Sequence, residues 1–123
     1  MKRLIFDLDG TLTTGCDADY EFSAPNVEVI EKLKYYKTKG YEIVISTARN
    51  MRTHEGNVGK INKHTLPVIL SWLQKHQVPF DEVYVGKPLC GFEGFYVDDK
   101  AIRPSEFCSL SPSEIKQLLD KET

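Results

Sequence analysis

A pair of carboxylates separated by one residue stands near the start of the chain, in the segment DLDGT at 7–11. Because side chains two positions apart on an extended chain point to the same side, Asp7 and Asp9 leave the preceding apolar run together. Gly10 then permits a sharp turn. One carboxylate can act as a nucleophile while the other transfers a proton. The segment therefore predicts nucleophilic chemistry with an acid or base beside it, and the alternative is a strand that ends in a polar turn.

Three further segments place polar groups after apolar runs. Thr47, in ISTARN at 45–50, offers a hydroxyl and a backbone N–H to a phosphoryl oxygen. Lys87, in VGKPLCGF at 85–92, offers a cation that offsets charge on a carboxylate and a transferring phosphoryl group. Asp98 and Asp99, in GFYVDDK at 94–100, repel each other unless a cation lies between them, and Mg²⁺ prefers such oxygen ligands. Each segment alone also has an ordinary structural explanation: a polar residue at a strand end, a solvated lysine and a charged turn, respectively.

The elements that must position these groups alternate between strand and helix. Short apolar runs predict strands over 3–8, 41–46, 82–85 and 94–97. Apolar stripes at helical spacing predict helices over 26–39 and 65–76, and a capping box at Ser111 with Pro112 and Glu114 predicts a final helix. Alternation of this kind is typical of βαβ units around a parallel sheet. Ligands bind at the carboxyl edge of such sheets, where all four polar segments are expected to lie.

Taken together and in this order, the four segments resemble the motifs of the haloacid dehalogenase superfamily of aspartate-nucleophile phosphatases. The resemblance spans nearly the whole chain, and it implies an α/β fold, a Rossmann-like three-layer sandwich with a central parallel sheet and bound Mg²⁺. The metal is expected on Asp7, the backbone carbonyl of Asp9, and Asp99 with help from Asp98. Which of the two adjacent acids binds directly stays open.

The roles that the resemblance implies follow the same motifs. Asp7 is expected to attack phosphorus and form an aspartyl phosphate, while Asp9 first protonates the leaving oxygen and then removes a proton from water. Thr47 orients the phosphoryl group and Lys87 balances its charge. Further substrate contacts are expected at Thr11, Ala48, Arg49 and Arg52. The polar stretch 49–64 could also be a solvated loop.

Longer segments, STARNMRTHEGNVGKIN, GKPLCGF and DDKAIRPSEF, look like a small bacterial group of capsule biosynthesis phosphatases. This resemblance implies a sugar or polyol phosphate as substrate. Stretches 10–25 and 50–65 are too short for a cap domain, so residues 1–123 are expected to form one capless domain. Either the substrate is large or neighbouring subunits close the site, which favours a homo-oligomer.

Other functions fit the same motifs. A mutase or phosphotransferase would keep all four segments, an open site would admit a phosphoprotein, and a phosphate-binding module could have lost turnover. A dehalogenase would need neither Asp9 nor a metal.

The composition limits the classes of molecule that this protein is expected to bind. A net charge of −2 gives no basic surface for nucleic acid or a membrane. No apolar window is long enough to span a membrane, and the N-terminus lacks a signal-peptide pattern. Cys16, Cys90 and Cys108 have no CxxC spacing, which argues against a zinc site or a disulfide framework. We therefore expect a cytoplasmic enzyme with no nucleic-acid or membrane partner.

Overall fold

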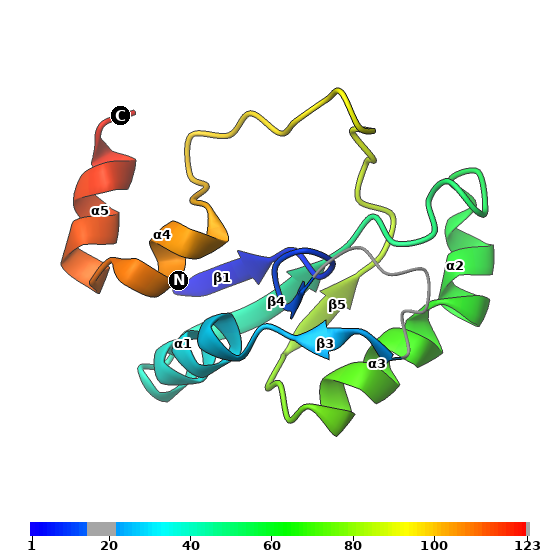
Figure 1. Cartoon of the computed structure of the whole chain (residues 1–123), viewed down its shortest axis with the longest axis horizontal. Coiled ribbons are helices and arrows are strands. Elements are labelled where there is room, and N and C mark those ends of the chain that lie inside the picture. Colours follow the sequence, from blue (N-terminus) through cyan, green and yellow to red (C-terminus); the bar gives the residue numbers. More distant parts are fainter. Residues whose placement is uncertain (15–21, 123) are drawn as a thin grey trace. The chain divides into compact units, whose positions relative to one another are not determined.

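The structure, a computed structural model, describes residues 1–14 and 22–122 (Figure 1). The chain forms two compact units, Met1–Leu89 and Cys90–Thr123. The N-terminal unit contains every strand in the described part of the chain. The C-terminal unit contains two short helices.

A parallel sheet organises the N-terminal unit. Its strands β1 (Arg3–Phe6), β4 (Glu42–Ser46) and β5 (Glu82–Tyr84) lie in the order β1-β4-β5. Ile5 of β1 lies opposite Val44, and Ser46 lies opposite Tyr84. The run EIVIS makes β4 the central strand because its β-branched side chains pack well on a pleated surface. A separate antiparallel pair joins β2 (Thr13–Thr14) to β3 (Ala24–Pro25).

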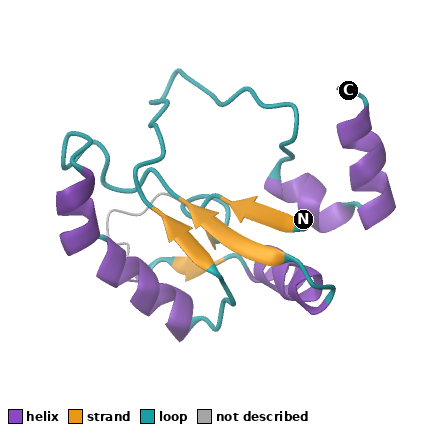
Figure 2. Ribbon diagram, turned by 180° about the vertical axis from the view of Figure 1, so that it is seen from behind, coloured by secondary structure: helices purple, strands orange, loops and turns teal. Residues whose placement is uncertain are grey.

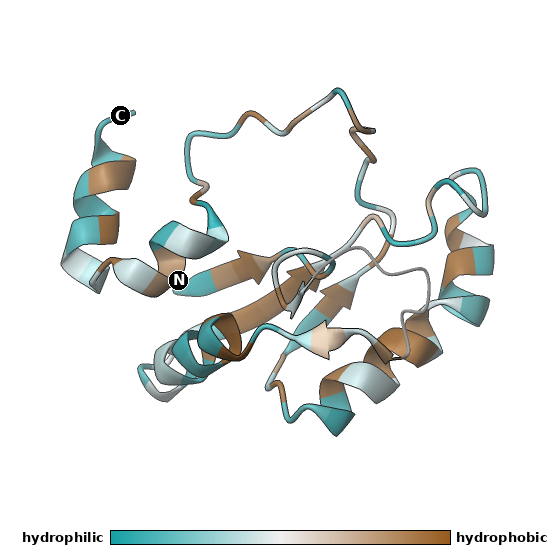
Figure 3. Ribbon diagram, viewed as in Figure 1, coloured by the Kyte–Doolittle hydropathy of each residue, from teal (hydrophilic) through white to brown (hydrophobic). Residues whose placement is uncertain are grey.

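Three helices belong to the same unit: α1 (Val27–Thr38), α2 (Val58–His64) and α3 (Leu66–Lys75). The Asn26 side chain caps α1 by accepting the Val29 N–H, and Gly40, at φ 88°, turns the chain after it. Helices α1 and α3 lie on the same side of the sheet in both ribbon views (Figure 2). Figure 3, coloured by hydropathy, shows hydrophobic residues in brown on both helices.

The core of this unit lies between that side of the sheet and the two helices. Ile43 and Ile45 of β4 are fully buried, as are Leu33 of α1 and Leu73 of α3. Trp72 is buried as well, and its indole N–H donates to the Ser23 carbonyl at 2.8 Å. A buried indole needs such a partner, so this bond fixes α3 against the segment before β3.

The C-terminal unit holds α4 (Pro104–Ser109) and α5 (Pro112–Asp120). The predicted capping box is present: Ser111 Oγ accepts the Glu114 N–H at 3.2 Å, and the Glu114 carboxylate accepts the Ser111 N–H at 2.9 Å. None of the side chains of α5 is buried, although Ile115, Leu118 and Leu119 form an apolar stripe.

The α/β class with a central parallel sheet is confirmed, and two local predictions were wrong. Residues 58–64, expected in a polar loop, form α2, because Asn57 caps its first turn and Ile61 is buried. Residues 94–97, expected as a strand, are not one, because an extended apolar segment becomes a strand only where a neighbouring strand bonds to it. The expected absence of a cap over 10–25 falls partly on residues 15–21, which lie outside the described residues, as does Cys16.

None of the helices in the described residues has the length and apolar character of a membrane span.

Candidate active site

The turn after β1 shapes the start of the site. The Leu8 carbonyl accepts three backbone N–H groups, from Thr11 at 3.2 Å, Leu12 at 2.8 Å and Thr13 at 3.0 Å. Gly10 takes a φ of +87°, a left-handed conformation that a residue with a Cβ adopts only with strain. The strand therefore ends at Phe6, two residues earlier than the apolar run predicts, and Asp7 and Asp9 stand on a tightly closed turn.

Asp7 is held from two sides. The Thr11 hydroxyl donates to Asp7 Oδ2 at 3.0 Å, and Lys87 Nζ lies 3.5 Å from Asp7 Oδ1. The Asp7 side chain is 37% exposed, so it is both oriented and accessible. Thr11, predicted to contact the substrate, thus contacts the predicted nucleophile. An accessible carboxylate with a fixed orientation and a neighbouring cation can attack an electrophile bound above it.

Asp9 forms a bidentate ion pair with Arg49. Arg49 Nε donates to Asp9 Oδ2 at 2.9 Å, and Arg49 Nη2 donates to Asp9 Oδ1 at 2.7 Å. The Arg49 side chain is 1% exposed and that of Asp9 is 20% exposed. Arg49 was predicted to contact the substrate, and in the structure its guanidinium binds the predicted acid/base. Two parallel bonds from a planar guanidinium fix both the position and the rotation of a carboxylate.

The ends of β4 and β5 are joined by backbone hydrogen bonds. The Thr47 N–H donates to the Tyr84 carbonyl at 2.9 Å, and the Lys87 N–H donates to the Thr47 carbonyl at 3.1 Å. Thr47 is 1% exposed, and its Oγ1 accepts the Arg49 N–H at 3.0 Å. The predicted phosphoryl ligand is therefore a buried threonine whose hydroxyl oxygen also stabilises the turn that leads to Arg49.

The N-terminal unit brings together six of the predicted site residues: Asp7, Asp9, Thr11, Thr47, Arg49 and Lys87. Ala48 is half-buried between Thr47 and Arg49, and Arg52 is exposed in the following turn. Sequence reasoning missed Thr13, a buried residue whose Oγ1 accepts the Gly10 N–H at 3.2 Å. A second threonine only two residues after Thr11 was the available signal.

Asp98 and Asp99 belong to the C-terminal unit. Both are exposed, and Asp98 Oδ1 accepts the Lys100 N–H at 2.8 Å. They line a hollow of about 190 Å³ together with Glu106 and Glu122. Carboxylate oxygens are the donors that a hard divalent cation takes, so the donor set of the predicted site fits Mg²⁺. Within the described residues, no cluster of three or more acidic, histidine or cysteine side chains is already assembled around a metal position.

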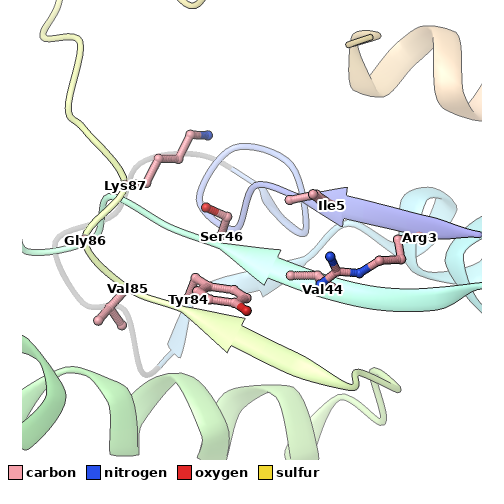
Figure 4. Close-up of a pocket in the computed structure, with 8 residues that line it drawn as sticks. All are labelled: Arg3, Ile5, Val44, Ser46, Tyr84, Val85, Gly86 and Lys87. Atoms are coloured by element: carbon pink, nitrogen blue, oxygen red, sulfur yellow. The ribbon is translucent and has the colours of Figure 1, made fainter. Parts of the chain in front are cut away.

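A second hollow, of about 400 Å³, lies on the face of the sheet that carries Ile5, Val44 and Tyr84, and it extends to Lys87 (Figure 4). Ile5 is 65% exposed and Tyr84 is 55% exposed. Strands of a parallel sheet are ordinarily covered on both faces, and residues of Met1–Leu89 cover this face only in part, because Val44 is 2% exposed while Ile5 and Tyr84 are not buried.

Residues 4–121 match the family described as haloacid dehalogenase-like hydrolase. The chain belongs to this family. A crystal structure of a structural-genomics target from Vibrio cholerae is 63% identical in sequence, covers 100% of both chains and superposes with a TM-score of 0.98. The HAD-like hydrolase fold with a central parallel sheet is thereby established.

Two structures of the Pnkp1/Rnl/Hen1 RNA repair complex are more distant. Each is 23% identical with a TM-score of 0.49; they cover 68% and 88% of this chain, and 25% and 33% of their own chains. None of the curated proteins compared matches the chain.

Proposed function

We propose that this HAD-like hydrolase is a Mg²⁺-dependent phosphatase that hydrolyses phosphomonoesters through an aspartyl phosphate on Asp7. The observation that carries the proposal is the setting of Asp7, an accessible carboxylate oriented by Thr11 at 3.0 Å and accompanied by Lys87 at 3.5 Å. A nucleophilic carboxylate beside a cation suits phosphorus, because the cation offsets the charge of both the nucleophile and the phosphoryl oxygens.

The reaction would proceed in two balanced steps. In the first, the Asp7 carboxylate forms a bond to phosphorus, the bond to the leaving oxygen breaks, and Asp9 gives that oxygen a proton. In the second, Asp9 takes a proton from water, whose oxygen attacks phosphorus and releases Asp7 and inorganic phosphate. Arg49 supports the second step, in which Asp9 must be ionised, because its two hydrogen bonds fix and stabilise the Asp9 carboxylate.

Thr47 and Lys87 would bind the phosphoryl group. The bond from the Arg49 N–H uses an oxygen lone pair of Thr47, so the Thr47 hydroxyl hydrogen is left to donate to a phosphoryl oxygen. The backbone bond from Lys87 to Thr47 keeps these two groups in register.

Mg²⁺ would be held by Asp7, the backbone carbonyl of Asp9, and Asp99 with help from Asp98. When bound, it would supply further positive charge for the phosphoryl oxygens. The oxygen-only donor set supports Mg²⁺ over softer metals.

The proposed substrate is a sugar or polyol phosphate used in capsule or polysaccharide precursor synthesis in the cytoplasm. This part of the proposal is supported by the sequence resemblance to the capsule biosynthesis group. Turnover of phosphopeptides faster by orders of magnitude would favour a phosphoprotein phosphatase instead. Phosphate transfer between sugar positions would favour a mutase, and silence on every substrate would favour a binding module.

The test is phosphate release from a panel of sugar, polyol and nucleotide monophosphates, phosphopeptides and an aryl phosphate, with Mg²⁺. We expect Asp7→Asn to abolish turnover with an unchanged circular dichroism spectrum, because the substitution is nearly isosteric. Asp120→Asn, at a carboxylate in a surface ion pair with Lys116, is the matched control and should keep full activity. Chelation should stop the reaction and added Mg²⁺ should restore it. Full activity in Asp7→Asn would refute the aspartyl-phosphate mechanism.

A further inference from the structure

Each aspartate of the segment DLDGTLT at 7–13 is bonded by a threonine four residues later in the chain. The Thr11 hydroxyl donates to Asp7 Oδ2 at 3.0 Å, and the Thr13 hydroxyl donates to Asp9 Oδ1 at 3.5 Å. The closed turn after β1 brings both threonines back to the carboxylates that precede it. The spacing that orients the proposed nucleophile is therefore repeated for the proposed acid/base.

Thr13 lies in the buried part of β2, where its hydroxyl group has two partners. The side chain is 1% exposed, and its Oγ1 accepts the Gly10 N–H at 3.2 Å while its hydrogen is donated to Asp9. Valine has nearly the same shape as threonine and high strand propensity, so packing within β2 does not require a hydroxyl group. Burying a hydroxyl group is unfavourable unless it forms hydrogen bonds. The hydroxyl at position 13 is therefore explained by its bonds to Gly10 and Asp9.

Asp9 Oδ1 receives bonds from two donors of different chemistry. Arg49 Nη2 donates to it at 2.7 Å, whereas the bond from Thr13 is long, at 3.5 Å. Arg49 therefore holds the ionised carboxylate more strongly than Thr13 does. A guanidinium can only donate, and it is best matched to a carboxylate with both oxygens free to accept. A hydroxyl group can donate or accept, so Thr13 can stay bonded to Asp9 whether or not the carboxyl group carries a proton.

We propose that Thr13 is a positioning residue for Asp9 in the first half-reaction, an inference that rests on the proposed function. The Gly10 N–H fixes the Thr13 oxygen, and the Thr13 hydroxyl keeps the Asp9 carboxyl group in place while it carries the proton that the leaving oxygen receives. That proton passes from Asp9 to the leaving oxygen, and Thr13 keeps its own. Because Thr13 is 1% exposed, it acts through Asp9 and not on the substrate.

The role given to Thr13 predicts a dependence on the leaving group. An alkyl phosphate needs a proton on its leaving oxygen, whereas a nitro-substituted aryl phosphate releases a stable phenolate without one. Thr13→Val removes the hydroxyl group and nearly conserves the shape of the side chain. It should lower kcat/KM about 10-fold for the alkyl ester and no more than about twofold for the aryl ester. Thr13→Ser keeps the hydroxyl group and should return the ratio of the two kcat/KM values toward that of the wild type.

Thr65→Val is the matched control for the loss of a buried hydroxyl group. Thr65 is 3% exposed, and its hydroxyl donates to Asn50 Oδ1 at 2.7 Å, so the substitution removes a comparable bond that does not involve Asp9. The ratio of kcat/KM for the two esters should stay at its wild-type value in this variant. Equal losses on both esters in Thr13→Val would mean that Thr13 only stabilises the fold, and would overturn the proposal. If valine at position 13 prevents folding, Thr13→Ala removes the same hydroxyl group without adding a methyl group beside Gly10.

A second measurement does not depend on activity. In protein labelled with ¹³C at the aspartate carboxyl groups, the nuclear magnetic resonance signal of the Asp9 carboxyl carbon reports its hydrogen bonds. Thr13→Val should shift this signal more than that of Asp7, and Thr65→Val should leave it in place. An Asp9 signal that does not move in Thr13→Val would refute the contact even if the phosphatase assignment held. A wild type that hydrolyses neither ester, together with the expected shift of the Asp9 signal, would refute the phosphatase assignment and leave the contact established.

Discussion

The ion pair between Arg49 and Asp9 offers the sharpest test of how the site is held together. Arg49→Met removes the guanidinium while keeping much of the side-chain volume, and Asp9→Ala removes the carboxylate. The two partners differ in burial, because the Arg49 side chain is 1% exposed and that of Asp9 is 20% exposed. The two single substitutions should therefore have unequal costs.

The loss in the free energy of unfolding depends on which charged group remains without its partner. Asp9→Ala leaves a buried guanidinium without its carboxylate, which should cost about 3 kcal/mol of the free energy of unfolding. Arg49→Met leaves a carboxylate that water can reach, and the cost should be about 1.5 kcal/mol, close to one charged hydrogen bond. The double variant should cost less than the sum, with a coupling energy of about 2 kcal/mol.

Urea unfolding followed by fluorescence of Trp72 measures these energies. Trp72 is the lone tryptophan and is buried in the same unit as the pair, so it reports the unfolding of that unit. Lys39→Met, which removes a cation from an exposed position, should change stability little. In activity, Arg49→Met should lower kcat about 100-fold with a smaller effect on KM, because it misorients the acid/base rather than the substrate. A coupling energy near zero together with wild-type kcat would refute the role given to Arg49.

Three further predictions concern stability. Gly10→Ala should cost about 1–2 kcal/mol and lower activity, because Gly10 has a φ of +87° in the turn that carries Asp7; an unchanged urea midpoint would contradict this. Trp72→Phe should cost about 2 kcal/mol by removing the bond to the Ser23 carbonyl and part of the packing, and circular dichroism melting that matches the wild type would contradict it. Two hydrogen bonds, chiefly the one from Lys37 and then the one from the Ile43 N–H, hold the pKa of Asp81 below its ordinary value. The ionised carboxylate therefore stabilises the fold fully at pH values above the ordinary pKa, and this stabilisation is lost as the pH falls through the lowered pKa. The difference in melting temperature between wild type and Asp81→Asn should therefore be constant near neutral pH and shrink below about pH 4; a constant difference down to pH 2 would argue against it.

Much of the fold could be predicted because its signals are local. The runs that became β1 and β4 are apolar over several consecutive residues, and α1 begins at a good cap and ends near a glycine. Helix α2 was not predicted because its sequence is mostly polar and Ile61 is its one buried residue, so no apolar residues at helical spacing indicate a helix. Residues 94–97 were predicted as a strand because strand propensity is local, whereas strand formation needs a neighbour that the sequence does not identify.

The sequence indicated several of the residues that the structure brings together, but not which of them contact one another. DLDGT, Thr47 and Lys87 stood out because each follows an apolar run, and the structure brings them together at the ends of β1, β4 and β5. The contact between Arg49 and Asp9 joins residues 40 positions apart, and such a pair leaves no local pattern. The contacts of Thr11 with Asp7 and of Arg49 with Asp9 were not predicted, because sequence spacing does not show which polar side chains form hydrogen bonds with one another.

The backbone bonds that connect Thr47 with Tyr84 and Lys87 also bear on how this enzyme can be redesigned. Both bonds are made by main-chain atoms, so exchanging the side chain at position 87 leaves the backbone that presents it in place. Analogues of different length or charge can thus be installed at this position, and the resulting rates would report on the reacting group itself. Positions 9, 11 and 47 lack that independence, because there the side chains also make hydrogen bonds that hold the site together.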